Sequence, residues 1–195
     1  MELDRARTYS MQHTFRAGGA LVLDAIDDVE SKGLAFGTVV PASPIRLRIQ
    51  ERRKVGDFFM GPWPVKIVSP RFVEVLRADD FSGWTTFPIG VIGRLSEELR
   101  EHRGLAVTGR SGPPDRSREE RVVLPPPVPN GEAMPHRLGL HPQDWDGSDL
   151  FVPEGTTHIC VSERVRDAVA RARLTGVEFT RLTEYVRADL DALDE

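Results

Sequence analysis

The densest group of potential metal ligands in the sequence consists of His136, His141, Asp144 and Asp146. Imidazole nitrogens and carboxylate oxygens bind zinc and related cations, so such a group would support metal-assisted hydrolysis if a rigid element held it. The His-x4-His spacing falls in a proline-bounded loop rather than on one face of a helix. We therefore predict that these side chains are solvated loop residues and that the protein binds no metal.

Two other kinds of site are suggested by short motifs, but their spacing is wrong. Residues 144–149 resemble a calcium loop, yet Asp149 stands where that loop needs glycine, and no glutamate follows at the twelfth position. Ser69 and Ser162 lie where helix caps lie, outside any G-x-S-x-G turn, and the paired glycines lack the lysine of a phosphate loop. The sequence thus predicts no enzyme, with no catalytic residue and no cofactor.

What remains is a set of charged and aromatic residues in two segments that have no apolar period, residues 109–120 and 142–154. Loops on a rigid scaffold often carry recognition, and tryptophan is enriched in binding hot spots. We predict a partner-binding surface there, built from Trp145, Asp144, Asp146, Asp149, Glu154, Arg110, Arg116 and Arg118. The alternative for Trp145, that it fills the edge of its own core, stays open, whereas Trp84 is expected to be buried in a strand.

The elements that would position these loops come from two similar units separated by an offset of 93 residues, which relates Ser69 to Ser162. Each unit reads as a short β-branched strand, a serine N-cap, an amphipathic helix, a glycine turn and a second strand. The helices are predicted at residues 70–79 and 163–172, with strands at 66–68 and 158–161 before them and glycines 83 and 176 after them. A chance likeness of two generic units is the alternative to an internal repeat.

The remaining elements are predicted from the turn-forming residues and the apolar patterns between them. Strands are predicted at residues 34–40 and 45–53, and a loop at 109–120. The proline-rich segment 125–135 is expected to cross the surface and to join sub-halves 1–124 and 136–195 of one domain spanning 1–195. An amphipathic helix is expected after Thr183. The predicted class is α+β, with mixed sheets, two strand–helix–strand units and a C-terminal helix.

Composition limits the classes of partner. The net charge of −4 comes from the acidic C-terminal tail, and the basic run 46–54 is interrupted by apolar residues, so we predict a solvated strand and no nucleic-acid partner. No run approaches the roughly 20 apolar residues of a membrane span, and no signal peptide is visible, which predicts a cytoplasmic protein without membrane contact. The single cysteine, Cys160, is expected to be a buried, inert thiol.

Four blocks carry a resemblance to a known family. They are VSPRFVEVLRADDFSGWTTFP (68–88), GLAVTGRSGPPDRS (104–117), WDGSDLFVPEG (145–155) and CVSERVRDAVARARLTGVEF (160–179). In this order they resemble the eleventh immunity-protein family of bacterial polymorphic toxin systems, which is abundant in myxobacteria and was formerly a domain of unknown function. The family is related to immunity paralogues with a double C-x-x-C-G zinc ribbon, which this chain lacks because it has only Cys160.

The resemblance implies an α+β protein that binds a cognate protein toxin inside the producing cell and neutralises it. A homodimer is compatible with that role. Two alternatives remain at this stage: a self-associating structural or regulatory domain, and a small metal-dependent enzyme that uses residues 136–149. Metal stoichiometry would separate the enzyme from the other two, and a toxin gene immediately upstream would favour the immunity protein.

Overall fold

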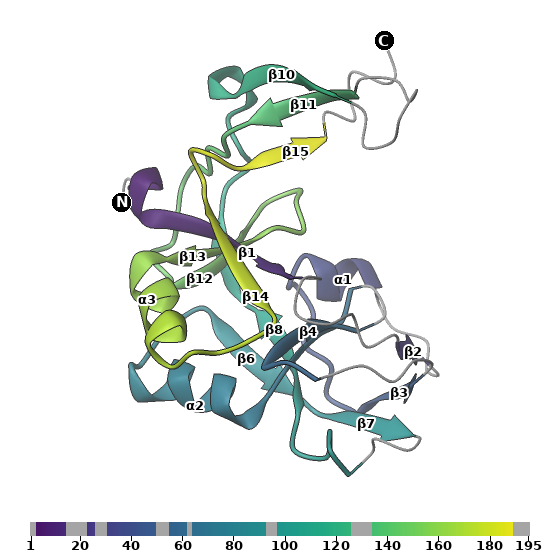
Figure 1. Ribbon diagram of the computed structural model, residues 1–195. Helices are drawn as coiled ribbons and strands as arrows, with labels where there is room; N and C mark the ends of the chain where they lie inside the picture. The colour runs from purple at the N-terminus through teal and green to yellow at the C-terminus, as the bar shows by residue number, and fades with distance from the viewer. Residues whose placement is uncertain are drawn as a thin grey trace.

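The computed structural model describes residues 3–14, 23–25, 31–49, 55–61, 64–92, 97–125 and 134–188. Within them the chain forms helices and mixed and antiparallel sheets, so the α+β class is confirmed (Figure 1). None of the helices in these ranges is long and apolar enough to cross a membrane.

One antiparallel sheet is built around the first predicted unit. Its strand order is β4 (Phe58–Met60), β5 (Lys66–Val68), β8 (Arg103–Val107) and β6 (Trp84–Phe87). Helix α2 (Pro70–Ala78) connects β5 to β6, as the periodicity of its apolar residues predicts. Ser69 caps this helix by accepting the backbone N–H of Phe72 at 3.2 Å, and Pro70 at the first position has no N–H to satisfy.

A second sheet is built around the second predicted unit. Its order is β14 (Val177–Arg181), β1 (Thr8–His13), β13 (Ile159–Ser162), β12 (Leu150–Pro153) and β9 (Gly109–Ser111). Helix α3 (Glu163–Arg171) connects β13 to β14. The order β12, β13, β1, β14 matches the order β4, β5, β8, β6, with the N-terminal strand β1 in the place that β8 takes in the first sheet. β9 adds to the edge and pairs in parallel with β12.

The two units also agree in local geometry. Asp80 and Arg173 both adopt positive φ, at 49° and 53°, and Gly83 and Gly176 share a φ of 83°. After each helix one backbone N–H bonds back five residues, Phe81 to the carbonyl of Leu76 and Leu174 to that of Val169. This is the Schellman pattern of a helix end. The predicted helices and turns are therefore confirmed, and descent from one duplicated unit stays a prediction.

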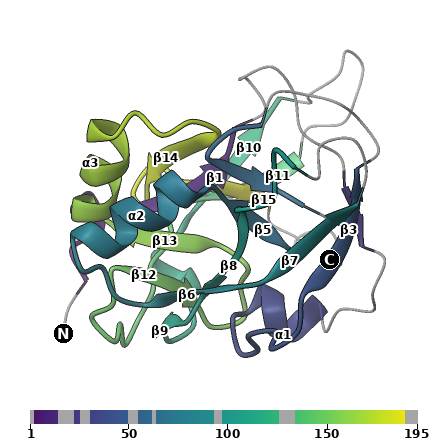
Figure 2. The same ribbon diagram turned by 90° about the horizontal axis from the view of Figure 1, so that it is seen from below.

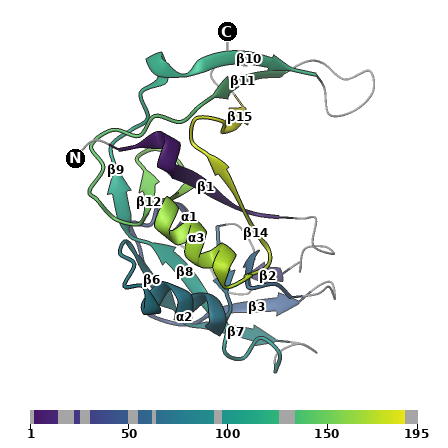
Figure 3. The same ribbon diagram turned by 60° about the vertical axis from the view of Figure 1, so that its left-hand side comes forward.

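The two sheets share one apolar core, in which α2 and α3 lie side by side (Figures 2 and 3). The buried stripes are Phe72, Val73 and Leu76 on α2, and Val165, Ala168 and Val169 on α3. Strand residues of both sheets complete the cluster. Because members of the proposed sub-halves 1–124 and 136–195 belong to this same cluster, these parts are not packed as separate cores.

Two three-stranded sheets flank the core. One has the order β2 (Leu23–Ala25), β3 (Ile45–Ile49), β7 (Ile89–Ile92), with α1 (Ser31–Ala35) close by. The other has the order β10 (Glu120–Leu124), β11 (Met134–Leu138), β15 (Val186–Ala188) and stands away from the body at the top of Figure 1. Short 3₁₀ turns, η1 (Arg5–Arg7) and η2 (Arg116–Arg118), precede β1 and β10.

Three sequence predictions are wrong in part. Residues 34–40 are not a strand, because α1 reaches Ala35 and the chain then turns at Gly37. Residues 109–111, assigned to a loop, form strand β9 because their backbone pairs with β12. Residues 186–188, assigned to the C-terminal helix, form strand β15 because they pair with β11, and residues 189–195 lie outside the described part.

Other predictions concern the proline-rich segment, the basic run and the cysteine. β10 and β11, on either side of residues 126–133, pair with each other as antiparallel strands, and residues 126–133 lie outside the described part. Ile45 and Leu47 of β3 are buried and Arg46 and Arg48 exposed, which confirms alternation over residues 45–48; residues 50–54 are not described. Cys160 is fully buried, which raises the pKa of its thiol.

Candidate functional site

The two predicted recognition loops lie against each other. The Gly112 N–H donates to the carbonyl of Gln143 at 2.7 Å, and the Asp115 N–H donates to that of His141 at 2.9 Å. Further along, the Asp146 N–H donates to the Arg110 carbonyl at 3.0 Å. These bonds connect segments more than 25 residues apart in the sequence, so the loops form one surface held by backbone contacts.

Asp146 is used to hold this surface together. One carboxylate oxygen accepts from the backbone and hydroxyl of Ser148, at 2.9 and 2.5 Å, and the other accepts the Arg110 N–H at 2.7 Å. Burial alone would raise the pKa of Asp146, but these hydrogen bonds to its charged form outweigh burial and lower the pKa. The carboxylate oxygens of Asp146 are thus largely occupied by hydrogen bonds within the protein.

Asp149 and Arg110 also have structural partners. Asp149 accepts from the hydroxyl of Ser162 at 2.9 Å and from the backbone N–H of Ser82 at 3.2 Å. The Arg110 guanidinium donates to the carbonyls of Val107, Gly109 and Gly37, and burial lowers the pKa of this group. Both side chains are therefore used to hold the two loops in position.

Trp145 packs inward. Its indole N–H donates to the Ser148 carbonyl at 3.0 Å, and its ring lies 5.9 Å from that of Phe151 in a separate small core with Leu140 and Leu182. The side chain is half-buried in this arrangement. These contacts favour the alternative in which Trp145 fills the edge of its own core. Trp84 is likewise half-buried, and its indole N–H donates to the Phe81 carbonyl at 2.8 Å.

We expect Trp145→Ala to lower the free energy of unfolding by about 2 kcal/mol, less than a fully buried tryptophan would cost, because the ring is only half-buried. Urea unfolding followed by circular dichroism measures this change. Arg118→Ala, which removes an exposed side chain of the neighbouring loop, serves as the control and should change the value by less than about 0.5 kcal/mol. Equal stability of the two variants would show that the indole makes no such packing contribution.

The four remaining predicted residues, Asp144, Glu154, Arg116 and Arg118, are exposed. Two of them belong to a ridge that we define as residues 113–118. The ridge contains η2, which Asp115 caps by accepting the backbone N–H of Ser117 at 3.1 Å; hydrogen bonds from Ser117 also lower the pKa of Asp115. Backbone and cap together give the ridge a fixed shape.

A hollow lies on each side of this ridge. Asp115 and Arg118 border one of about 530 Å³, which Arg5, His141 and Gln143 also line; we call it the Arg5 hollow. Pro113, Pro114 and Arg116 border the other, of about 570 Å³, together with Glu154 and Thr156; we call it the Arg116 hollow. Ridge residues therefore border two different hollows, and both predicted loops contribute to both hollows.

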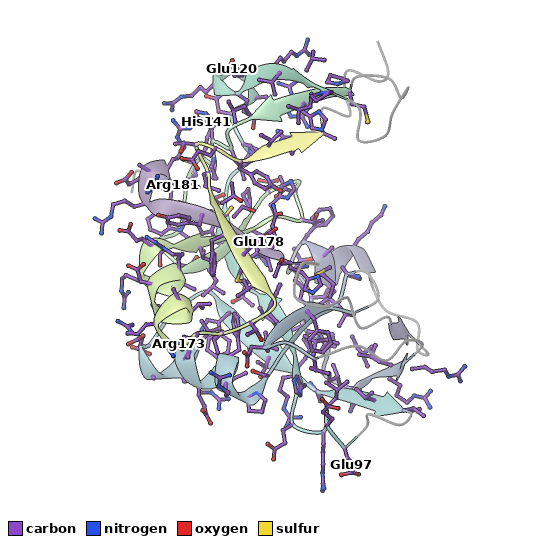
Figure 4. All side chains as sticks on the ribbon, in the orientation of Figure 1. Glu97, Glu120, His141, Arg173, Glu178 and Arg181 are labelled. Carbon is purple, nitrogen blue, oxygen red and sulfur yellow. The ribbon has the colours of Figure 1, made fainter. Side chains whose placement is uncertain are left out.

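His141 lines the Arg5 hollow. It lies between the outer sheet and the body of the molecule (Figure 4). Its Nε2 lies 2.6 Å from Nη1 of Arg5. Burial and the neighbouring charges of Arg5 and Arg118 lower the pKa of His141, so the neutral ring accepts this hydrogen bond at pH 7. Arg5 comes from the N-terminal turn, far from the loops in sequence, and no local pattern points to it.

The far end of the ridge is anchored by a buried ion cluster. Glu119 is fully buried and accepts two hydrogen bonds from Arg187 of β15, at 2.7 and 2.9 Å, and Arg137 of β11 lies 3.9 Å from it. Both hydrogen bonds come from Nη2 of Arg187, so one nitrogen of the guanidinium is shared between the two carboxylate oxygens. The far end of the ridge is therefore attached to the outer sheet.

The histidines and acids considered as metal ligands are used separately. His136 lies on β11 with Nδ1 2.8 Å from the Met134 carbonyl, His141 pairs with Arg5, and Asp146 with Ser148. Among the described residues there is no group of three or more histidine, cysteine, aspartate or glutamate side chains that could hold a metal ion.

Comparisons with known proteins add no assignment, since no family model matches the chain and no curated protein matches its sequence.

Proposed function

We propose that this chain is an immunity protein that binds a cognate bacterial toxin inside the producing cell, and that the ridge 113–118 with its two hollows is the contact surface. The observation that carries the proposal is that both loops chosen from sequence for recognition meet at this ridge. A rigid ridge between two hollows offers a partner both a projection and two recesses, which suits shape-complementary protein binding.

The four blocks that resemble the immunity family support the proposal through their place in the fold. Two blocks contain α2 with β6, and α3 with most of β13 and part of β14. The other two contain most of β8, β9 and most of the ridge, and the loop through Trp145 with β12. The resemblance thus falls on the shared core and on the surface beside it.

The charges at the ridge are mixed. Arg116 and Glu154 border the same hollow, Arg118 and Asp144 are also exposed, and the other predicted acids are held by internal hydrogen bonds. A mixed rim does little to steer a partner from a distance, but it fixes register and penalises wrong partners. Recognition by this surface therefore depends on the complementarity of a particular toxin rather than on net charge.

The direct test uses the polypeptide encoded immediately upstream of this gene. When that polypeptide is produced in a bacterium, we expect growth arrest that co-production of this chain relieves, with recovery of a stoichiometric complex. A neighbour that is harmless, or one whose toxicity this chain leaves unchanged while the two proteins do not associate, would contradict the proposal. Self-association of this chain in the absence of any complex would favour a structural role instead.

The contact surface is tested by charge reversal. Arg116→Glu with Arg118→Glu is expected to weaken toxin binding at least about thirtyfold, equivalent to roughly 2 kcal/mol, because both side chains project from the ridge. The matched control is Arg77→Glu with Arg100→Glu, on α2 and on the turn before β8, which changes net charge equally away from the ridge. If calorimetry showed the same loss of toxin affinity for both double variants, or no loss for either, the ridge would be excluded as the interface.

A further inference from the structure

A third hollow, which contains no ridge residue but shares Thr157 and His158 with the Arg116 hollow, lies where β1 passes β4 and β5. It has a volume of about 290 Å³, and β1, the loop before β13 and the turn before β15 complete its wall. Lys66, His158 and Tyr185 bring polar groups to it, and Met60 and Ile159 bring apolar ones. An enclosed apolar wall with a few converging polar groups is the usual form of a small-ligand site.

Lys66 is the unusual member. Only three of the 26 basic residues of the chain are lysines, and this one is largely removed from water. Its Nζ lies 3.3 Å from the Pro64 carbonyl, and burial lowers the pKa of its amine to about 8. Near neutral pH most copies therefore carry a positive charge that the protein has partly desolvated.

His158 and Tyr185 form a pair beside it. The tyrosine hydroxyl lies 2.9 Å from Nδ1 of His158, and the rings meet edge to face at 5.2 Å. Burial, together with the charges of Arg187 and Lys66, lowers the pKa of His158 to about 4, so the ring is neutral at pH 7. Burial also raises the pKa of Tyr185, which keeps its hydroxyl protonated. When that hydroxyl donates to Nδ1, the ring proton lies on Nε2, which becomes a donor.

The described residues that line this hollow include no aspartate or glutamate. Glu178 of β14 acts electrostatically on His13, another residue of the lining, whereas burial alone accounts for the lowered pKa of Lys66. A buried ammonium without a counter-charge is costly, and a bound anion would remove that cost by pairing with it. The lining thus combines a cation, neutral hydrogen-bond donors and a volume too small for a large ligand.

We propose that this Lys66 hollow is a binding site for the oxyanion group of a small molecule, a carboxylate or a phosphate, with Lys66 as its counter-ion and the His158–Tyr185 pair as its hydrogen-bonding partner. Lysine suits this role because its ammonium is a compact point charge that fits a narrow site, whereas the planar fork of arginine needs more room. The site is distinct from the ridge and does not depend on the toxin-binding proposal.

The test titrates the full-length chain with two probes, succinate and inorganic phosphate, by calorimetry at constant ionic strength set with sodium chloride. We expect saturable binding of at least one probe, weakened about tenfold or more in Lys66→Met because a charge-assisted contact is lost. Lys32→Met, which removes an exposed lysine on α1, is the control and should bind as the wild type does. Preference for succinate or for phosphate identifies the group.

A second measurement needs no variant. Between pH 7 and pH 9 the charged fraction of an amine with a pKa of about 8 falls about tenfold, so the affinity for succinate should fall by a similar factor. His158 and His13 have lowered pKa values and stay neutral over this range, while Tyr185, whose pKa is raised, keeps its proton. Absence of binding by both probes, equal binding by Lys66→Met, or an affinity for succinate independent of pH would each overturn the proposal.

Discussion

Replacing Gly83 or Gly176 with alanine is expected to lower the free energy of unfolding by roughly 3–5 kcal/mol, the sum of a left-handed alanine and a steric overlap. Both glycines have a φ of 83°. A Cβ on Gly83 would lie 2.0 Å from the Leu150 carbonyl oxygen, and one on Gly176 would lie 2.1 Å from that of Phe58. These obstacles are backbone atoms of strands in the shared core, so neither can move aside cheaply.

Gly155 is the matched control for this prediction. It also has positive φ, at 72°, but a Cβ there would meet nothing within 4 Å. Gly155→Ala should therefore cost only the conformational part, about 1–2 kcal/mol. Urea unfolding of the three variants measures the difference. If all three lost the same stability, the close approach of Gly83 to β12 and of Gly176 to β4 would not be a constraint on the fold.

The glycines illustrate which parts of the fold could be predicted from sequence. Ser69 and Ser162, the helices after them and the two glycines form patterns within about 15 residues, and each such pattern has a local cause in capping, periodicity or positive φ. The helices, the glycine turns and the Ser69 cap are confirmed, whereas the Ser162 side chain makes no capping hydrogen bond and donates to Asp149 instead. The identity of the backbone that each glycine approaches is not local, because it lies in the other unit.

Strand order shows the same limit. No pattern in residues 8–13 indicates that β1 is inserted between β13 and β14, more than 140 residues away. Residues 186–188 were assigned to a helix because their spacing fits one, yet pairing with β11 makes them a strand. Tertiary hydrogen bonding overrides weak local preference in such short segments.

For the candidate site too, local features of the sequence were predictable and distant contacts were not. Charge and lack of apolar period were enough to locate the two loops that meet at the ridge. They were not enough to separate residues that brace the loops, Asp146 and Asp149, from residues that project from them, Arg116 and Arg118. That distinction depends on partners such as Ser82, which is distant in the chain.

Asp149 has a counterpart in Asp57, and together they clamp the two units. Asp57 accepts from the Ser69 hydroxyl at 2.7 Å within its own unit and from the Thr175 N–H at 2.9 Å in the other unit. Asp149 accepts from Ser162 within its own unit and from Ser82 in the other. Each carboxylate thus joins the helix cap of one unit to the turn that precedes the last strand of the other.

An arginine reinforces each clamp in the same reciprocal way. Arg71 lies 3.4 Å from the Asp57 carboxylate and donates to the Ala172 carbonyl at 3.0 Å, at the end of α3. Arg164 lies 3.3 Å from Asp149 and donates to the Asp79 carbonyl at 3.3 Å, at the end of α2. The two clamps therefore cross the contact between the helices in opposite directions.

We expect Asp57→Ala to lower the free energy of unfolding by about 3 kcal/mol, because it leaves the buried Ser69 hydroxyl and the Thr175 N–H without their charged acceptor. Asp149→Ala should cost about 2 kcal/mol, since its bonds are longer and its site is more exposed. Asp79→Ala is the control: it removes an exposed carboxylate that pairs with Arg171 at 3.3 Å and should cost less than about 0.5 kcal/mol. Guanidinium unfolding of the three variants gives the comparison.

The clamps also predict how the loss of stability relates to binding. Asp149 lies just before β12, in the loop that carries Trp145, while Asp57 lies just before β4, in the first sheet. If the clamps only join the units, either variant should bind the toxin partner that we propose with unchanged affinity per folded molecule, at a temperature where the variant remains folded. A selective loss of affinity in Asp149→Ala would instead show that the position of this loop, and not only the stability of the core, determines recognition. If Asp57→Ala lowered the free energy of unfolding no more than Asp79→Ala does, the Asp57 carboxylate would not join the units at all.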